Sequence, residues 1–158
     1  MSRKFLVQTA MVIDARPEDL YAIVSDYRVG HPAILPKPYF TVLTVEKGGV
    51  GAGSLLMTRL KAWGQEFSYH QLVTEPEPGR RIVETDVDTG QFSSFTFDPL
   101  DGGKRTKVTI FSEFPASPGI KGFLERLTQP PFVRRLYTQE LRNLAAYVQS
   151  KQAVPVVG

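Results

Sequence analysis

Two histidines are the residues of this 158-residue chain best suited to acid–base chemistry near neutral pH. An imidazole gains or loses its proton between about pH 5 and 8, so a positioned histidine can act as a general acid or base. His31 stands in YRVGHPAIL, in a loop before the second predicted strand, and we expect it at the rim of any cavity. His70 stands in QEFSYHQLV, where Phe67 and Tyr69 alternate with it, so we expect its side chain on the outer face. At most one of the two is therefore a candidate for catalysis.

Most other catalytic and metal-binding arrangements are excluded by composition. The chain has no cysteine, and two histidines cannot supply a three-histidine metal site. No His-Glu-x-x-His, Gly-x-Ser-x-Gly or Walker-type motif occurs. The glycine-rich stretch GGVGAG joins two predicted strands and does not open a helix, so it lacks the usual context for binding phosphate. We expect neither a metal nor a cofactor.

Polar side chains within otherwise apolar strands are the remaining candidates for chemistry. Alternation predicts that six of them point inward: Thr9, Thr58, Tyr69, Gln71, Ser93 and Ser112. Glu84 or Thr85 joins them, depending on which way the strand RRIVETDV faces. Such groups could orient a ligand carbonyl and pass protons, or they could simply satisfy one another in a partly wet core. The catalytic residues, if any, stay unknown, with His31, Tyr69 and Glu84 as candidates.

Strand patterns occupy most of the chain up to Phe114. In KFLVQTAMVID every second residue from Phe5 to Ile13 shares one face, which predicts a half-buried strand. Pro17, followed by two acidic residues, then opens a short helix, because proline and carboxylates both suit a first helical turn. Three prolines in RVGHPAILPKP limit any second helix to about one turn. From Tyr39 onward, six apolar runs alternate with glycine-containing turns, which is typical of an antiparallel meander.

A long amphipathic helical segment follows, from about residue 117 to 151. Its apolar residues recur at intervals of three and four, as Tyr137, Leu141 and Leu144 do, and form one continuous face. We place Glu140 and several arginines mostly on the opposite face.

Two consecutive prolines interrupt this helical segment. Pro131 has no N–H group for the carbonyl four residues earlier, and its ring disfavours helical geometry at Pro130. We therefore expect the helix to break or kink near Gln129, giving a short lid helix at about 117–128 and a long helix at about 131–150. In the alternative interpretation, the prolines only follow the curvature of the sheet. The lid would cap the cavity with Phe123, Leu127 and Phe132.

Together these elements predict an α+β fold. The expected order is one strand, two short helices, six strands and the long C-terminal helix. A seven-stranded curved antiparallel sheet has one apolar face, and the helix is long enough to cover it. If a cavity lies between the two, its apolar walls come from Phe5, Val7, Leu56, Leu60, Phe95, Phe97, Val108, Ile110, Tyr137 and Leu141.

Composition restricts the partners and the compartment. Hydrophobic residues make up 42% of the chain and charged residues 22%, so we expect a single globular domain over 1–158. The net charge of +3 is small and the basic residues are scattered, which argues against a nucleic-acid partner. Without a secretory signal or an apolar run near ~20 residues, we expect a cytoplasmic protein with no stable membrane insertion. The oligomeric state is not determined by the sequence.

Several stretches together carry a family resemblance: IDARPEDLYAIVSDY, GGVGAGS, TEPEPGRRIV, FTFDPLDGGKRTKVTI and LRNLAAYVQ. Their order and spacing, over about residues 5–151, resemble the START-like, or helix-grip (SRPBCC), superfamily and its polyketide cyclase/dehydrase branch. The resemblance implies the helix-grip fold and a deep cavity for a hydrophobic ligand. In that family the hairpin at AWGQE often borders the cavity mouth, so Trp63 could stack on a ligand or only plug the end of the sheet. The expected ligand-binding residues are Thr9, Leu56, Thr58, Leu60, Trp63, Tyr69, Ser93, Phe95, Phe97, Val108, Ile110, Ser112, Phe123, Leu127, Phe132, Tyr137 and Leu141.

Three functions stay open at this point. The first is binding of a hydrophobic small molecule, such as a lipid, a polyketide or an aromatic compound. The second is a polyketide cyclase or dehydratase, which needs at least two strongly polar or ionisable groups converging in the pocket. The third is a protein-interaction module, which predicts a collapsed cavity and an exposed apolar patch.

Overall fold

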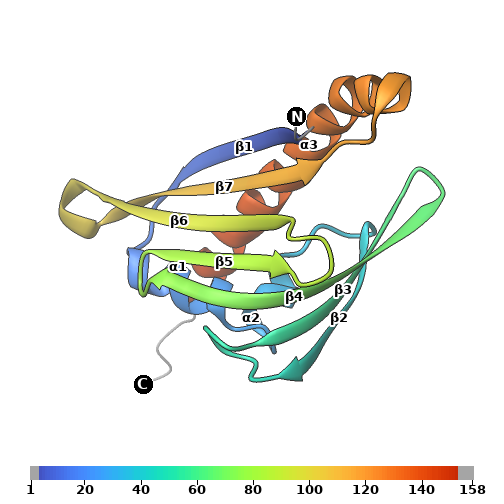
Figure 1. Ribbon diagram of the computed structural model, residues 1–158. Helices are drawn as coiled ribbons and strands as arrows, with labels where there is room; N and C mark the ends of the chain where they lie inside the picture. The colour runs from blue at the N-terminus through green and yellow to red at the C-terminus, as the bar shows by residue number, and fades with distance from the viewer. Residues whose placement is uncertain (1–3, 153–158) are drawn as a thin grey trace.

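The computed structural model describes residues 4–152 and shows a curved sheet with a long helix across one face (Figure 1). Neighbouring strands are antiparallel, in the order β1-β7-β6-β5-β4-β3-β2. The predicted α+β fold, with seven strands, two short helices after the first strand and a long C-terminal helix, is confirmed. The elements are β1 (Lys4–Ile13), α1 (Pro17–Ser25), α2 (Gly30–Ile34), β2 (Phe40–Lys47), β3 (Leu55–Ala62), β4 (Gln65–Glu77), β5 (Arg81–Asp86), β6 (Phe92–Leu100), a 3-10 turn η1 (Asp101–Gly103), β7 (Arg105–Pro115) and α3 (Gly119–Gln152).

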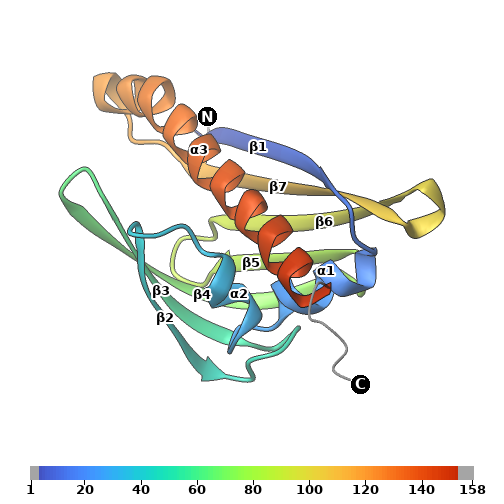
Figure 2. The same cartoon turned by 180° about the vertical axis from the view of Figure 1, so that it is seen from behind.

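The three helices lie on the same side of the sheet. Figure 2 shows α3 running diagonally over the sheet, with α1 and α2 beside its C-terminal half. Leu141 and Leu144 of α3 are completely buried, together with Val7 of β1 and Leu20 of α1. Burying side chains of this size stabilises the fold by roughly 1.5–3 kcal/mol each, which holds the C-terminal half of α3 on the sheet.

Strands β1 and β7 show the alternation that the sequence predicts. Phe5 and Val7 are buried, whereas the residues between and beside them are exposed. The register places Val7 opposite Ser112 and Met11 opposite Val108, so that the apolar sets of both strands share the face toward α3. A slip of one residue would turn both sets to solvent, and the buried face therefore specifies this register.

The hairpin between β3 and β4 ends in an unusual turn. Ala62 pairs with Gln65, so the turn contains only Trp63 and Gly64. Both residues have positive φ, 52° for Trp63 and 69° for Gly64, as a type I′ turn requires. Asparagine or glycine usually occupies the first of these positions, because a side chain with positive φ is strained. A tryptophan held in this conformation at the tip of a hairpin is the kind of outlier that marks a functional position.

The expected break or kink near Gln129 is a kink. Because α3 is continuous from Gly119 to Gln152 with both prolines inside it, the expected separation into a helix at about 117–128 and another at about 131–150 is wrong. The prolines lack the N–H groups that would bond the carbonyls four residues earlier, and the helix instead changes direction between its first turns and the remainder (Figure 2). The hydroxyl of Thr128 donates to the carbonyl oxygen of Leu124 at 2.7 Å, a contact that also bends helices. Residues that favour a helix surround the prolines on both sides, so the segment kinks and does not end.

None of the helices within residues 4–152 is both long enough and apolar enough to cross a bilayer.

Candidate ligand-binding cavity

A cavity of about 130 Å³ lies between the inner face of the sheet, α2 and α3. This volume exceeds the room one water molecule needs but is smaller than the roughly 300–1,000 Å³ of pockets for drug-sized ligands. Apolar and aromatic side chains form most of its wall, and ionisable and hydroxyl groups gather at its inner end. The lining residues are His31, Leu35, Phe40, Leu43, Leu56, Thr58, Leu60, Trp63, Phe67, Tyr69, Gln71, Glu84, Gln91, Ser93, Phe95, Ile110, Phe114, Gln129, Phe132, Val133, Leu136, Tyr137 and Glu140.

Three ionisable groups meet at the inner end, and we call them the His31–Glu84–Glu140 cluster. They come from α2, β5 and α3 respectively. The Nε2 atom of His31 lies 3.7 Å from Oε1 of Glu84 and 3.8 Å from Oε1 of Glu140. All three side chains are at least 90% buried, so water screens their charges very little. Two carboxyl groups and an imidazole this close must share protons to limit the charge that they bury.

The imidazole of His31 is held in one orientation. Its Nδ1 lies 2.7 Å from the carbonyl oxygen of Val24, and because a carbonyl can only accept, Nδ1–H is the donor. The ring stacks on Tyr27 with 4.7 Å between centroids and meets the edge of Phe95 at 5.6 Å. Since Nδ1 is occupied, Nε2 is the nitrogen that faces the carboxyl groups and the cavity. This is how a histidine is oriented when it exchanges protons at one nitrogen.

The two carboxyl groups of the cluster differ in their surroundings. The hydroxyl of Tyr27 donates to Oε1 of Glu84 at 2.8 Å, a hydrogen bond that stabilises negative charge there. Burial, and then the nearby charge of Glu84, raise the pKa of Glu140 well above its ordinary value. Glu140 therefore keeps its proton at a pH where an exposed glutamate has lost it. A protonated carboxyl can donate a hydrogen bond to a ligand oxygen, which a carboxylate cannot do.

A second polar group, at the cavity wall and directly behind it, consists of hydroxyls. Ser93 Oγ lies 2.6 Å from Ser112 Oγ, and Ser112 is also hydrogen-bonded to the hydroxyl of Tyr137. Burial raises the pKa of Tyr137 above its ordinary value, so this phenol stays protonated across the physiological range. Thr58 donates to the side-chain oxygen of Gln71 at 3.1 Å on the opposite wall. These groups largely satisfy one another.

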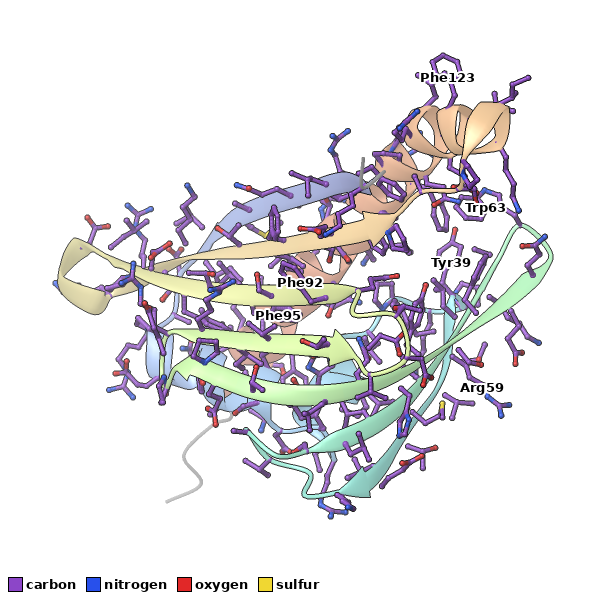
Figure 3. All side chains as sticks on the ribbon, in the orientation of Figure 1. Tyr39, Arg59, Trp63, Phe92, Phe95 and Phe123 are labelled. Carbon is purple, nitrogen blue, oxygen red and sulfur yellow. The ribbon has the colours of Figure 1, made fainter. Side chains whose placement is uncertain are left out.

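Aromatic residues form the opposite end of the cavity, which we call the mouth. The rings of Trp63 and Phe132 lie 4.5 Å apart between centroids, and Tyr39 meets Phe132 edge-on at 5.4 Å. Figure 3 shows Trp63 and Tyr39 on the same side of the molecule, where the β3–β4 hairpin approaches α3. Trp63 is 56% exposed, so this end of the cavity is the one that borders solvent.

The structure brings a large part of the predicted site to the cavity. Among the predicted residues, those on its wall are His31, Leu56, Thr58, Leu60, Trp63, Tyr69, Gln71, Glu84, Ser93, Phe95, Ile110, Phe132 and Tyr137.

Seven predicted ligand-binding residues do not line the cavity. Phe123 and Leu127 are exposed on α3 and do not cap the mouth, because their face of the helix is turned away from the sheet. The other five are at least partly buried behind the wall: Thr9, Phe97, Val108, Ser112 and Leu141. The hydroxyl of Thr9 is buried and has no hydrogen-bond partner among residues 4–152.

Three ionisable positions show where the sequence interpretation succeeds or fails. His31 is not at the rim, because the stretch after Gly30 forms α2 and buries the ring at the inner end. Glu140 is predicted on the solvent face, yet it is only 4% exposed. Its spacing from Tyr137 and Leu144, three and four residues, is the signal for the inner face. His70 lies outside the cavity as predicted, with its Nε2 atom 2.8 Å from Glu46.

The fold and the cavity together define a class of α+β proteins. In this class a curved antiparallel sheet wraps around a C-terminal helix, and an internal cavity lies between the two. The chain belongs to the polyketide cyclase/dehydrase and lipid transport family, whose family model matches residues 4–149. No curated protein matches the sequence.

Solved structures resemble the chain over nearly its whole length. The solution structure of KanY protein (ms6282) has 25% sequence identity and a TM-score of 0.80, covering 92% of this chain and 98% of that one. TTHA0849 from Thermus thermophilus has 20% identity and a TM-score of 0.76, covering 94% and 100%. The ZhuI aromatase/cyclase from Streptomyces sp. R1128 has 14% identity and a TM-score of 0.77, covering 96% and 97%. At such identities, likeness to the last two shows the fold alone.

Proposed function

We propose that the chain binds a hydrophobic small molecule, carrying at least one carbonyl or hydroxyl group, in the cavity between sheet and α3. The observation that supports this most is the polarity gradient of the cavity, from aromatic residues at the mouth to the His31–Glu84–Glu140 cluster at the inner end. An apolar wall with a few convergent polar groups is the usual design of small-molecule sites. A protein-interaction module would have a collapsed cavity, whereas the cavity formed by residues 4–152 is open.

The cluster supplies the anchor for the polar end of the ligand. A ligand oxygen entering an apolar pocket loses its hydrogen bonds to water, which is unfavourable by roughly 1–3 kcal/mol unless the site replaces them. The protonated carboxyl of Glu140 can donate to that oxygen. The hydrocarbon part of the ligand would contact Leu56, Phe95 and Ile110. Because the cavity measures about 130 Å³, a larger ligand requires Phe132 and Trp63 to separate.

Native mass spectrometry of the purified protein, followed by organic extraction, tests this proposal. We expect a bound apolar compound to co-purify, or N-phenyl-1-naphthylamine to bind with increased fluorescence. Val133→Phe fills the cavity from α3 and should weaken binding, whereas Val83→Phe, on β5 but not on the cavity wall, should not. Absence of both a co-purifying compound and probe binding would remove the proposal.

A polyketide cyclase or dehydratase is the second candidate, and the convergence of three ionisable groups favours it. In that function Nε2 of His31 would remove a proton from the carbon beside a ketone, and Glu140 would donate a proton to the ketone oxygen to form the enol. Deuterium exchange at the α-carbons of 2-decanone in D₂O, followed by NMR, measures this step without any co-reactant. Exchange catalysed by the wild type and lost in His31→Asn, with ketone binding retained, would support the enzyme. Binding without exchange would leave the carrier function alone.

A further inference from the structure

The first turns of α3 carry large apolar side chains on the face that is exposed to solvent. Ile120 is 80% exposed, Phe123 55%, Leu124 53% and Leu127 58%. Their spacing of three, one and three residues places all four on one face of the helix. We call these four residues the exposed stripe. In Figure 3, Phe123 points away from the body of the protein, on the opposite side of α3 from Trp63.

The orientation of the exposed stripe is fixed by contacts on the other side of the helix. Gly122 is buried, and a Cβ atom built on it would lie 1.6 Å from the carbonyl oxygen of Ser117, so the helix rests directly on the preceding chain. The N–H and the hydroxyl of Ser117 both donate to the carboxylate of Glu125 at 2.8 Å. Rolling the helix to bury the stripe would break these contacts. The contacts of Gly122 and Glu125 with Ser117 therefore keep the exposed stripe facing outward.

Basic residues surround the exposed stripe. Lys121 and Arg126 lie on its flanks, and Arg134 and Arg135 follow it along the helix; all four are at least partly exposed. None of them forms an ion pair with another residue of the 4–152 segment within 4.0 Å. The one acidic residue in this stretch, Glu125, accepts hydrogen bonds from Ser117, and it attracts Lys121 without forming an ion pair within 4.0 Å. An apolar face bordered by unpaired cations is typical of helices that lie in the interface of a lipid bilayer.

We propose that the exposed stripe binds reversibly to the surface of an anionic lipid bilayer, with its apolar side chains among the acyl chains and the flanking cations on lipid phosphates. A second copy of the chain fits this surface less well. A symmetric dimer through the stripe would bring the same basic residues together from both copies, and like charges repel. An anionic membrane buries the apolar side chains and neutralises the cations at once.

The position of the stripe gives the proposed docking a consequence for the cavity. Phe132, at the mouth, lies within two turns of Leu127 on the same helix. A protein docked by the stripe would hold its mouth near the bilayer, with the first turns of α3, a helix roughly 10–12 Å across, between the two (Figure 3). Docking itself does not depend on the proposed ligand binding.

Vesicle flotation tests the proposal with the full chain. We expect binding to phosphatidylcholine vesicles containing about 30% phosphatidylglycerol and weak binding to phosphatidylcholine alone, since cations near a surface respond to anionic lipid. The double variant Phe123→Glu and Leu127→Glu should abolish binding. Val87→Glu is the matched control, because Val87 is 50% exposed in the turn between β5 and β6 and is not part of α3, so this change should leave binding unchanged. Lys121→Gln and Arg126→Gln should each weaken binding roughly fivefold, and salt should reduce it.

Three results would overturn the proposal. The first is no binding of the wild type to anionic vesicles. The second is binding that the double glutamate variant does not reduce while circular dichroism shows it folded. The third is a dimer of the wild type that the same variant dissociates, without any binding to lipid, which would assign the stripe to a second copy. None of these outcomes depends on a ligand in the cavity. Failure of the membrane proposal can therefore be distinguished from failure of the proposed ligand binding.

Discussion

Replacing Glu140 by glutamine should make the protein increasingly more stable than the wild type as the pH rises. Burial raises the pKa of Glu140 in the folded state, while the unfolded chain has an ordinary value of about 4.3. Between these two values the folded state binds more protons than the unfolded state, so the free energy of unfolding of the wild type falls as the pH rises. Glutamine keeps a neutral, hydrogen-bonding side chain of the same shape and removes this dependence.

The slope of the effect follows from linkage. One proton of difference changes the free energy of unfolding by about 1.4 kcal/mol per pH unit, so the advantage of Glu140→Gln should grow by up to about 3 kcal/mol over two units. Urea unfolding followed by far-UV circular dichroism, at intervals between about pH 4.5 and 6.5, measures it. Glu125→Gln is the matched control. The N–H group of Ser117 lowers the pKa of Glu125, so the stability that this carboxylate contributes is already complete above the ordinary value of about 4.3. The difference between this variant and the wild type should therefore stay constant over the same pH range.

A constant difference between Glu140→Gln and the wild type over this pH range would refute the reasoning. It would mean that Glu140 ionises in the folded state as it does in the unfolded chain. The anchor for a ligand oxygen would then be a carboxylate and not a protonated carboxyl.

Three further predictions concern the mouth and α3. Trp63→Asn relieves a positive φ before Gly64, so we expect a melting temperature no lower than that of the wild type, together with weaker binding of N-phenyl-1-naphthylamine. Gly122→Ala places a Cβ atom against the Ser117 carbonyl, and amide hydrogen exchange in the first turns of α3 should become faster while exchange in the sheet is unchanged. Saturation with a ligand should slow amide exchange around Gln129 and Phe132, which line the cavity next to the kink of α3; unchanged exchange in a ligand-bound sample would mean that this part of the helix is a fixed wall.

The sheet could be predicted because the side chains of a strand alternate between its two faces, and this alternation is visible in the sequence. In β1 and β7, the face toward α3 carries no charged residue and the charged residues lie on the other face, so the direction of Val7 and Val108 is readable from the sequence. Glu84 is buried beside Ile82 on β5, but RRIVETDV has apolar and polar residues at both parities. The sequence of this strand alone therefore could not show which way the side chain of Glu84 points; the neighbouring strands were needed.

Two errors at α3 have one cause, which is that sequence rules are local and tertiary packing is not. Pro130 and Pro131 do oppose a helix locally, but the anchored segments before and after them keep the chain helical. Glu140 is charged, which favours solvent, although its position matches the buried face. Its burial depends on His31 and Glu84, which lie more than 50 residues away in the sequence. Such a cluster is a property of the assembled fold and has no local signature.

The pairing of β1 with β7 has a consequence for synthesis of the chain. Lys4 lies opposite Pro115, so the first strand has no hydrogen-bonding neighbour until about 100 later residues have been translated. During that interval the ribosome holds an apolar strand whose edge is open, the situation in which nascent chains associate wrongly or engage chaperones. Substitutions that weaken this last pairing should therefore lower the yield of folded protein in cells more than they lower the stability of the protein once it has formed.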